Sequence, residues 1–150
     1  MNIKKLKIYT LLIHCFIVIG AGHGIGIMGI FDVIGIIQIP EMLKNGIEFD
    51  FNGGFEDRLS LVIISSILGK LILIISLFLK NTRTKNLTGL FGLILLWISV
   101  YLLSSGNWNY DSLYEIAFWT STPFLISSMF LIFYIIKNIS QNKMNIKLTD

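Results

Sequence analysis

Charged residues are scarce in this chain, and their scarcity excludes an ordinary water-soluble domain. Only 14% of the 150 residues are charged, whereas 54% are hydrophobic and the mean hydropathy is +0.75. A soluble domain carries about 25% charged residues. A soluble core of this size cannot absorb so much apolar side chain. The composition therefore predicts an integral membrane protein with the lipid bilayer as its main partner.

Cysteine and histidine are also few, and their shortage removes several classes of function. The single cysteine, Cys15, cannot form an intramolecular disulfide. His14 and His23 lie nine residues apart on a predicted helix, about 13 Å along its axis, so one chain cannot clasp a haem between them. His14 and Asp32 are eighteen residues apart, about 27 Å on a continuous helix, so we expect no contact between them.

Motifs that would indicate catalysis or nucleic-acid binding are missing as well. The sequence contains no metal-ligand spacing, no phosphate-binding loop in its proper context and no Ser-His-Asp arrangement. We therefore expect no cofactor, and catalysis ranks behind the other functions considered. The basic residues form short clusters between apolar segments, which membrane topology explains, so nucleic acid is not an expected partner.

Long apolar runs are what the chain does contain. Four of them approach or reach the length of about 20 residues that a bilayer core requires, and they cover residues 8–31, 59–79, 87–103 and 116–136. Residues 32–58 form a predicted outer loop. The basic start resembles a signal peptide, but no small-x-small cleavage site follows, so we expect an uncleaved first span. The predicted fold class is an all-α integral membrane protein, with a single four-transmembrane-helix bundle over residues 1–150.

Lysine and arginine residues predict the orientation of this bundle. They gather before the first span, between the second and third, and after the fourth, whereas acidic residues dominate the other connections. Connections rich in lysine and arginine stay in the cytoplasm. The sequence therefore predicts both termini inside the cell, in a multi-pass protein of a bacterial inner (cytoplasmic) membrane.

The first span contains a glycine-rich run, which we interpret as a helix-packing surface. In lipid the backbone must satisfy its own hydrogen bonds, so a helix is enforced and glycines become places where another helix approaches closely. One helix face would serve packing inside the bundle, and the second predicts self-association. The glycines of the two faces are Gly20, Gly24 and Gly35 on one, and Gly22, Gly26 and Gly29 on the other.

Lys70 is the most informative single residue. It lies eleven residues after Leu59 and nine before Leu79, which places it near mid-membrane, where a lysine costs about 2.5–3.5 kcal/mol. No acidic residue lies at the same depth in the other predicted spans. One interpretation is that Lys70 lines a pore or cavity or meets an anionic group. The alternative is a neutral or hydrogen-bonded residue with a packing role.

Other polar residues are candidates for the same cavity. His23 is predicted slightly outward of Lys70, although the simpler interpretation is a neutral imidazole hydrogen-bonded to a neighbouring helix. Intramembrane hydroxyl groups more often join helices than line a path, and the same alternative applies to the serines and threonines here. The remaining members of the candidate set are Ser66, Thr120 and Ser127.

Two classes of function fit these features. The first is a homo-oligomeric channel- or pore-like protein, which includes membrane-permeabilising effectors, with Lys70 facing a polar cavity. The second is a membrane-embedded binding, sensor or complex subunit that recognises a lipid, a quinone, another small molecule or a partner protein. A continuous polar path past Lys70 would favour the first class. A closed cavity or an outward groove would favour the second.

Overall fold

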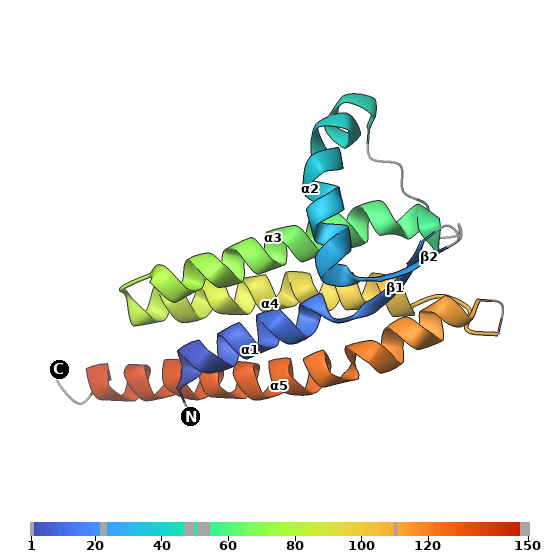
Figure 1. Cartoon of the computed structure of the whole chain (residues 1–150). Helices are drawn as coiled ribbons and strands as arrows, with labels where there is room; N and C mark the ends of the chain where they lie inside the picture. The colour runs from blue at the N-terminus through green and yellow to red at the C-terminus, as the bar shows by residue number, and fades with distance from the viewer. Residues whose placement is uncertain (1, 22–23, 47–49, 51–54, 110, 148–150) are drawn as a thin grey trace.

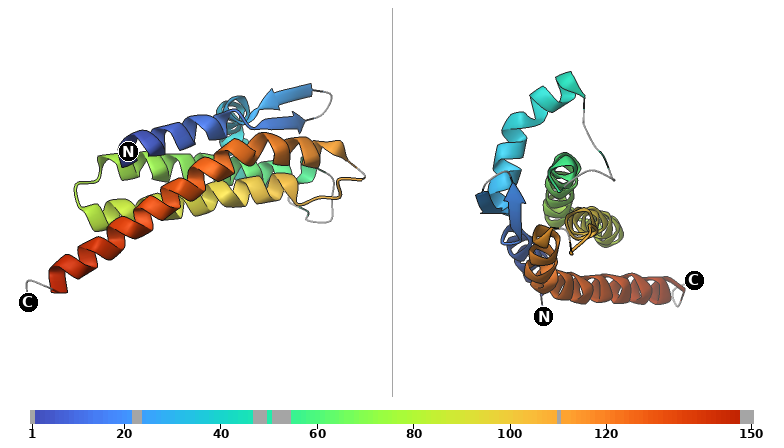
Figure 2. Two further views of the ribbon diagram at one scale, coloured as in Figure 1. Left: turned by 90° about the horizontal axis from the view of Figure 1, so that it is seen from below. Right: turned by 90° about the vertical axis from the view of Figure 1, so that its right-hand side faces the viewer.

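The computed structural model describes residues 2–21, 24–46, 50, 55–109 and 111–147. Helices α3, α4 and α5 lie side by side with α1 laid along them, whereas α2 stands away from the bundle at a steep angle (Figure 1). The N terminus, the α3–α4 turn and the C-terminal part of α5 lie at one end of the bundle (Figures 1 and 2). In chain order the elements are α1 (Ile3–Cys15), β1 (Val18–Ala21), β2 (Gly24–Ile27), α2 (Met28–Asn45), the short 3-10 helix η1 (Glu56–Arg58), α3 (Leu59–Phe78), α4 (Thr82–Ser104) and α5 (Ser112–Lys147).

Side-chain caps mark where the bundle helices begin. The Asn2 side chain accepts a hydrogen bond from the backbone N–H of Lys4 (3.0 Å), and Asn81 accepts one from Arg83 (2.9 Å). Asp111 accepts one from Leu113 (2.9 Å) at the start of α5. Each contact satisfies a backbone donor that the first helical turn leaves unpaired.

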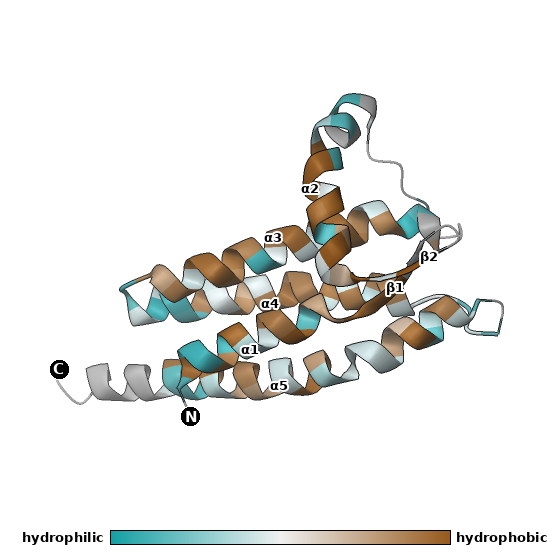
Figure 3. Ribbon diagram, in the orientation of Figure 1, coloured by the Kyte–Doolittle hydropathy of each residue, from teal (hydrophilic) through white to brown (hydrophobic). Residues whose placement is uncertain are grey.

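Three of the four predicted spans are confirmed as helices that are long and apolar enough to cross a membrane. They are α3, α4 and α5 up to residue 140, with mean hydropathies of 2.6, 2.1 and 1.6. Their surfaces are largely hydrophobic, and hydrophilic residues gather mainly toward the helix ends (Figure 3). One hydrophilic turn in the middle of α3 and another near the start of α2 stand out against this background (Figure 3).

The prediction of one continuous helix over residues 8–31 is wrong. The helix ends at Cys15, and the chain then forms an antiparallel hairpin before α2 begins at Met28. The backbone N–H of Met28 donates to the carbonyl of Ile17 (2.8 Å), which closes the base of the hairpin. Glycine alternates here with β-branched residues, as in Gly24-Ile25-Gly26-Ile27, and this two-residue period favours strands over a helix.

The glycines therefore do not form two faces of one helix. Gly20, Gly24 and Gly26 lie in the strands, and Gly29 lies in the first turn of α2 with its Cα beside Cys15. Gly22 lies outside the described residues. None of these four described glycines sits in an interface between two spanning helices.

The close helix contact lies between α3 and α4, at glycines that the sequence analysis did not select. A Cβ atom added to Gly92 would lie 2.9 Å from the carbonyl oxygen of Gly69 and 2.9 Å from the backbone nitrogen of Leu73. Only a residue without a side chain allows the two backbones to approach this closely. Helices α3 and α4 lie side by side along most of their length (Figure 1), and their backbones meet at these two glycines.

Helix α2 crosses the middle of α3. Gly35 of α2 packs against Ile63, and Asp32, one turn earlier, reaches Ser66 and Lys70. The crossing therefore brings an acidic side chain from the start of α2 to the centre of α3. Helix α2 also carries an exposed apolar surface made of Ile30, Val33, Ile34, Ile36 and Ile37.

Candidate functional site

Helix α1 turns its polar side chains inward, which is the reverse of a helix on a soluble protein. Lys7, Thr10 and His14 are spaced by three and four residues, so they fall on one face, and each has 0% exposed surface. The apolar residues Tyr9 and Leu12 are exposed on the opposite side. Such an arrangement suits a helix whose outer face meets lipid and whose inner face meets polar groups.

Each of these three side chains meets a serine from a different helix. Lys7 Nζ donates to Ser76 Oγ of α3 (2.8 Å) and to the carbonyl oxygen of Lys85 (3.3 Å). A Cβ atom at Gly89 would lie 2.8 Å from Lys7 Nζ, so the absence of a side chain there makes room for the ammonium group. The other two contacts are Thr10 Oγ1 with Ser127 Oγ of α5 (2.8 Å) and His14 Nε2 with Ser99 Oγ of α4 (3.1 Å).

An ion pair lies at the centre of the bundle. Lys70, the twelfth of the 20 residues of α3, pairs with the Asp32 carboxylate through Oδ2, and their side chains are only 12% and 10% exposed. The other carboxylate oxygen, Oδ1, accepts a hydrogen bond from the buried Ser66 hydroxyl (2.7 Å). Both oxygens of Asp32 thus have partners, which offsets part of the cost of removing the charges from water.

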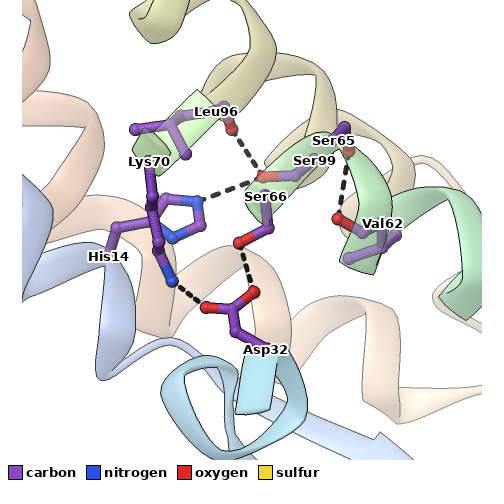
Figure 4. A network of polar contacts seen from close by, with 8 residues as sticks. All are labelled: His14, Asp32, Val62, Ser65, Ser66, Lys70, Leu96 and Ser99. Carbon is purple, nitrogen blue, oxygen red and sulfur yellow. Dashed lines mark hydrogen bonds and ion pairs between the residues drawn. The ribbon is translucent and has the colours of Figure 1, made fainter. Parts of the chain in front are cut away.

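His14 lies beside this ion pair (Figure 4). Its Nε2 atom contacts Ser99, whose hydroxyl donates in turn to the Leu96 carbonyl (2.7 Å). The Phe124 ring packs edge-on against the imidazole at 4.7 Å between centroids. The second ring nitrogen, Nδ1, is buried and has no hydrogen-bond partner among the described residues. The Lys70 side chain runs past the imidazole ring toward Asp32 (Figure 4). We call His14, Asp32, Ser66, Lys70 and Ser99 the central polar layer.

Polar contacts continue from the central polar layer toward the other end of the bundle. Thr120 Oγ1 of α5 accepts from the backbone N–H of Val18 (3.1 Å), which fixes the first strand of the hairpin against α5. Nearer that end, Arg58 donates to Ser105 Oγ (3.0 Å) and stacks on the Tyr114 ring at 5.4 Å. Polar pairs therefore occur at successive levels between one end of the bundle and the other.

The structure changes the predicted site in three respects. Lys70 does have an acidic partner, Asp32, because the hairpin turns the chain back toward mid-bundle. For the same reason His14 and Asp32, expected about 27 Å apart on a continuous helix, both lie in the central polar layer (Figure 4). His23 lies outside the described residues.

The remaining candidates stand at different places along the bundle. Ser66 belongs to the central polar layer, whereas Ser127 lies beside Thr10 and Thr120 holds the hairpin. Ser99 was missed because a lone serine in an apolar helix carries no local signal of its partner. The polar face of α1 had a signal, the three- and four-residue spacing of Lys7, Thr10 and His14.

We find no metal centre in the described part of the chain. No group of three or more His, Cys, Asp or Glu side chains is close enough there to hold an ion. In the central polar layer, His14 and Asp32 are the only such residues, and Lys70 neutralises the carboxylate. The layer offers proton donors and acceptors instead.

No family model, curated protein or solved structure matches this chain. The fold and the composition define its class: a small, mostly helical protein with three helices apolar enough to cross a membrane. A more specific function is inferred from the central polar layer and from the hairpin between α1 and α2, which brings the residues of this layer together.

Proposed function

We propose that the chain is a channel- or pore-like protein of a bacterial inner membrane, with N and C termini in the cytoplasm. In this proposal α3, α4 and α5 cross the membrane, and α1 with the hairpin forms an interrupted first crossing. The start of α1 and the turn between α3 and α4, which lie at the same end of the bundle (Figure 1), carry Lys4, Lys5, Lys80 and Arg83. The residues around the start of α3 and of α5, at the opposite end, include Asp57, Asp111 and Glu115, together with Arg58. The positive-inside rule supports the cytoplasmic placement of the basic end.

The interrupted first crossing supports a role in moving a solute. Non-helical backbone at membrane depth is tolerated where it is buried in protein or lines a cavity. Here Ile17 and Ile19 are buried, with 0% and 1% exposed surface. Discontinuous crossings near the bilayer midplane commonly form the ion and substrate sites of transport proteins.

The observation that carries the proposal is the Lys70–Asp32 ion pair directly beside this interruption. A charged pair at mid-membrane is costly, and intramembrane ionisable residues most often mark ion pathways or proton relays. The stacked contacts of Lys7, Thr10 and His14 extend the polar interior toward the cytoplasmic end. His14, Ser66 and Ser99 are fully buried, so the polar path at this level is shielded from bulk solvent.

We include self-association in the same proposal. Its basis is strand pairing at the hairpin, and not packing between helices. Among the described residues the sheet has two strands, so β2 pairs with β1 on one side, and Ile25 in it is 71% exposed. Backbone donors and acceptors on the free edge of a strand need a partner when lipid surrounds them. A second copy that pairs with this edge would supply that partner.

Ion flux into liposomes that contain the purified protein tests the proposed function. We expect wild type to carry flux above empty liposomes, measured with dyes for K⁺, Cl⁻ and H⁺. The double variant Asp32→Asn/Lys70→Met removes both charges and keeps side chains of similar volume. It should therefore fold, and its flux should be at least tenfold lower than that of wild type. Lys80→Met, the same change at an exposed lysine, should behave as wild type.

Two results would contradict the proposal. One is wild-type protein that carries no flux of any tested ion. The other is wild-type flux in the folded double variant. The native mass in nanodiscs, measured on the same preparation, tests self-association separately, and a single copy would contradict that part.

A binding or sensor subunit is the second candidate, and one observation favours it. A hollow of about 420 Å³ lies on the outside of α4 and α5, lined by Ile94, Trp97, Ile98, Tyr101 and Ile132. Trp97 Nε1 donates to Ser128 Oγ (2.9 Å), which holds one wall of this hollow in place. An apolar hollow with aromatic walls suits a lipid tail or a quinone ring. Absence of flux in wild type would favour this candidate.

A further inference from the structure

The central polar layer contains groups that can carry a proton, and its packing restricts what else can pass. His14, Ser66 and Ser99 have 0% exposed surface, and Phe124, which packs edge-on against His14, is equally buried. An ion with even part of its hydration shell needs an open channel at this level. A proton needs only neighbouring donors and acceptors, with water molecules between them where side chains do not touch.

We propose that the solute moved through the central polar layer is the proton, relayed by Lys70, Asp32 and His14. This inference rests on the proposed channel- or pore-like function and narrows it to one species. Its basis is the arrangement of three titratable groups from three elements, α1, α2 and α3, in one buried layer (Figure 4).

His14 supplies the acceptor that the relay needs. Its Nε2 contacts Ser99, while Nδ1 is buried without a partner among the described residues. Neutral imidazole holds one proton, so the nitrogen that carries no proton can accept another. From α4 and α5 the ring meets Ser99 and Phe124, which do not titrate. The charged groups near it are Lys70 of α3 and, through Lys70, Asp32 of α2. Cys15, the next residue along α1, lies against Gly29 instead.

The proton balance is simple. The Lys70 ammonium transfers one proton to the free nitrogen of His14, breaking an N–H bond at Nζ and forming one on the ring. A proton that enters from the opposite side binds the Asp32 carboxylate and passes to the Lys70 amine, which restores the ion pair. The imidazolium then releases its extra proton to water on the side of Thr10. No electron moves and each group ends as it began.

Selectivity of the wild-type protein tests this inference without any variant. In liposomes at equal salt, a tenfold proton gradient should drive proton flux, read by an internal pH dye. Gradients of K⁺, Na⁺ or Cl⁻ at equal pH should drive none above that of empty liposomes. Flux of one of these ions as large as that of protons would overturn the inference and leave the channel-like function standing. No flux of any species would overturn both.

A conservative change at His14 tests its place in the relay. His14→Gln keeps a hydrogen-bonding group toward Ser99 but cannot take up a proton, so we expect proton flux to fall at least tenfold in folded protein. The matched control is Ser65→Ala on α3, since in the described part of the chain Ser65 donates to carbonyls of its own helix, at Leu61 and Val62. Proton flux in folded His14→Gln equal to that of Ser65→Ala would overturn the role of His14.

Discussion

Asp32→Asn alone is expected to destabilise the folded protein by about 3–5 kcal/mol, the typical cost of leaving one member of a buried ion pair without its partner. Lys70 would keep its charge near the middle of α3, with Ser66 as a neutral neighbour. Lys70→Met should cost less, because the Asp32 carboxylate that remains keeps the hydrogen bond from the buried Ser66 hydroxyl. The measurement is the free energy of unfolding in detergent for each single variant.

The double variant decides whether the two charges are coupled. Asp32→Asn/Lys70→Met leaves no unpaired charge, so its stability should recover to well above that expected from adding the two single effects. Lys80→Met, at an exposed position, should lie within about 0.5 kcal/mol of wild type. Strictly additive effects of the two single changes would mean that Lys70 and Asp32 do not interact.

Gly92→Ala is the second change expected to have a large effect. The new Cβ would lie 2.9 Å from the Gly69 carbonyl oxygen and 2.9 Å from the Leu73 nitrogen, and these backbone atoms cannot rotate away. We expect a loss of about 1–3 kcal/mol, typical of overpacking, and a larger loss for Gly92→Leu. Thermal unfolding in detergent measures both.

Gly26→Ala is the matched control for this change. Its Cβ would meet the Phe31 ring at 2.8 Å, and a partly exposed side chain can move aside. It should therefore cost clearly less than Gly92→Ala. The reverse order would point back to a helix-packing role for the glycine-rich run and against the hairpin.

Features that depend on neighbouring residues can be predicted from the sequence, whereas contacts between residues far apart in it cannot. The three long apolar runs predict α3, α4 and α5 because length and hydropathy are local properties. Lys70 is recognisable for the same reason, as a single charge inside such a run. The partners Thr10–Ser127 and His14–Ser99 are separated by 117 and 85 residues, and no local pattern links them.

The glycine-rich run departs from the predicted helix for a physical reason. In lipid a helix is the default for any apolar segment, and that rule outweighed the two-residue alternation of glycine and isoleucine over residues 24–27. Once a continuous helix was assumed, Asp32 lay far from both His14 and Lys70. The hairpin reverses this consequence, because Val18 pairs with Ile27 and the chain returns to mid-bundle before Asp32.

A designed disulfide across the hairpin tests the central claim, that the chain doubles back and brings Asp32 to Lys70. Val18 and Ile27 are paired across the two strands, where opposite Cα atoms lie about 4.5–5.5 Å apart. On a continuous helix these residues would lie about 13.5 Å apart, beyond the reach of a disulfide. In a Cys15→Ser background, we expect Val18→Cys/Ile27→Cys to form an intramolecular disulfide under mild oxidation, while each single variant does not. Two free thiols in the folded, oxidised double variant would contradict the hairpin and the site built on it.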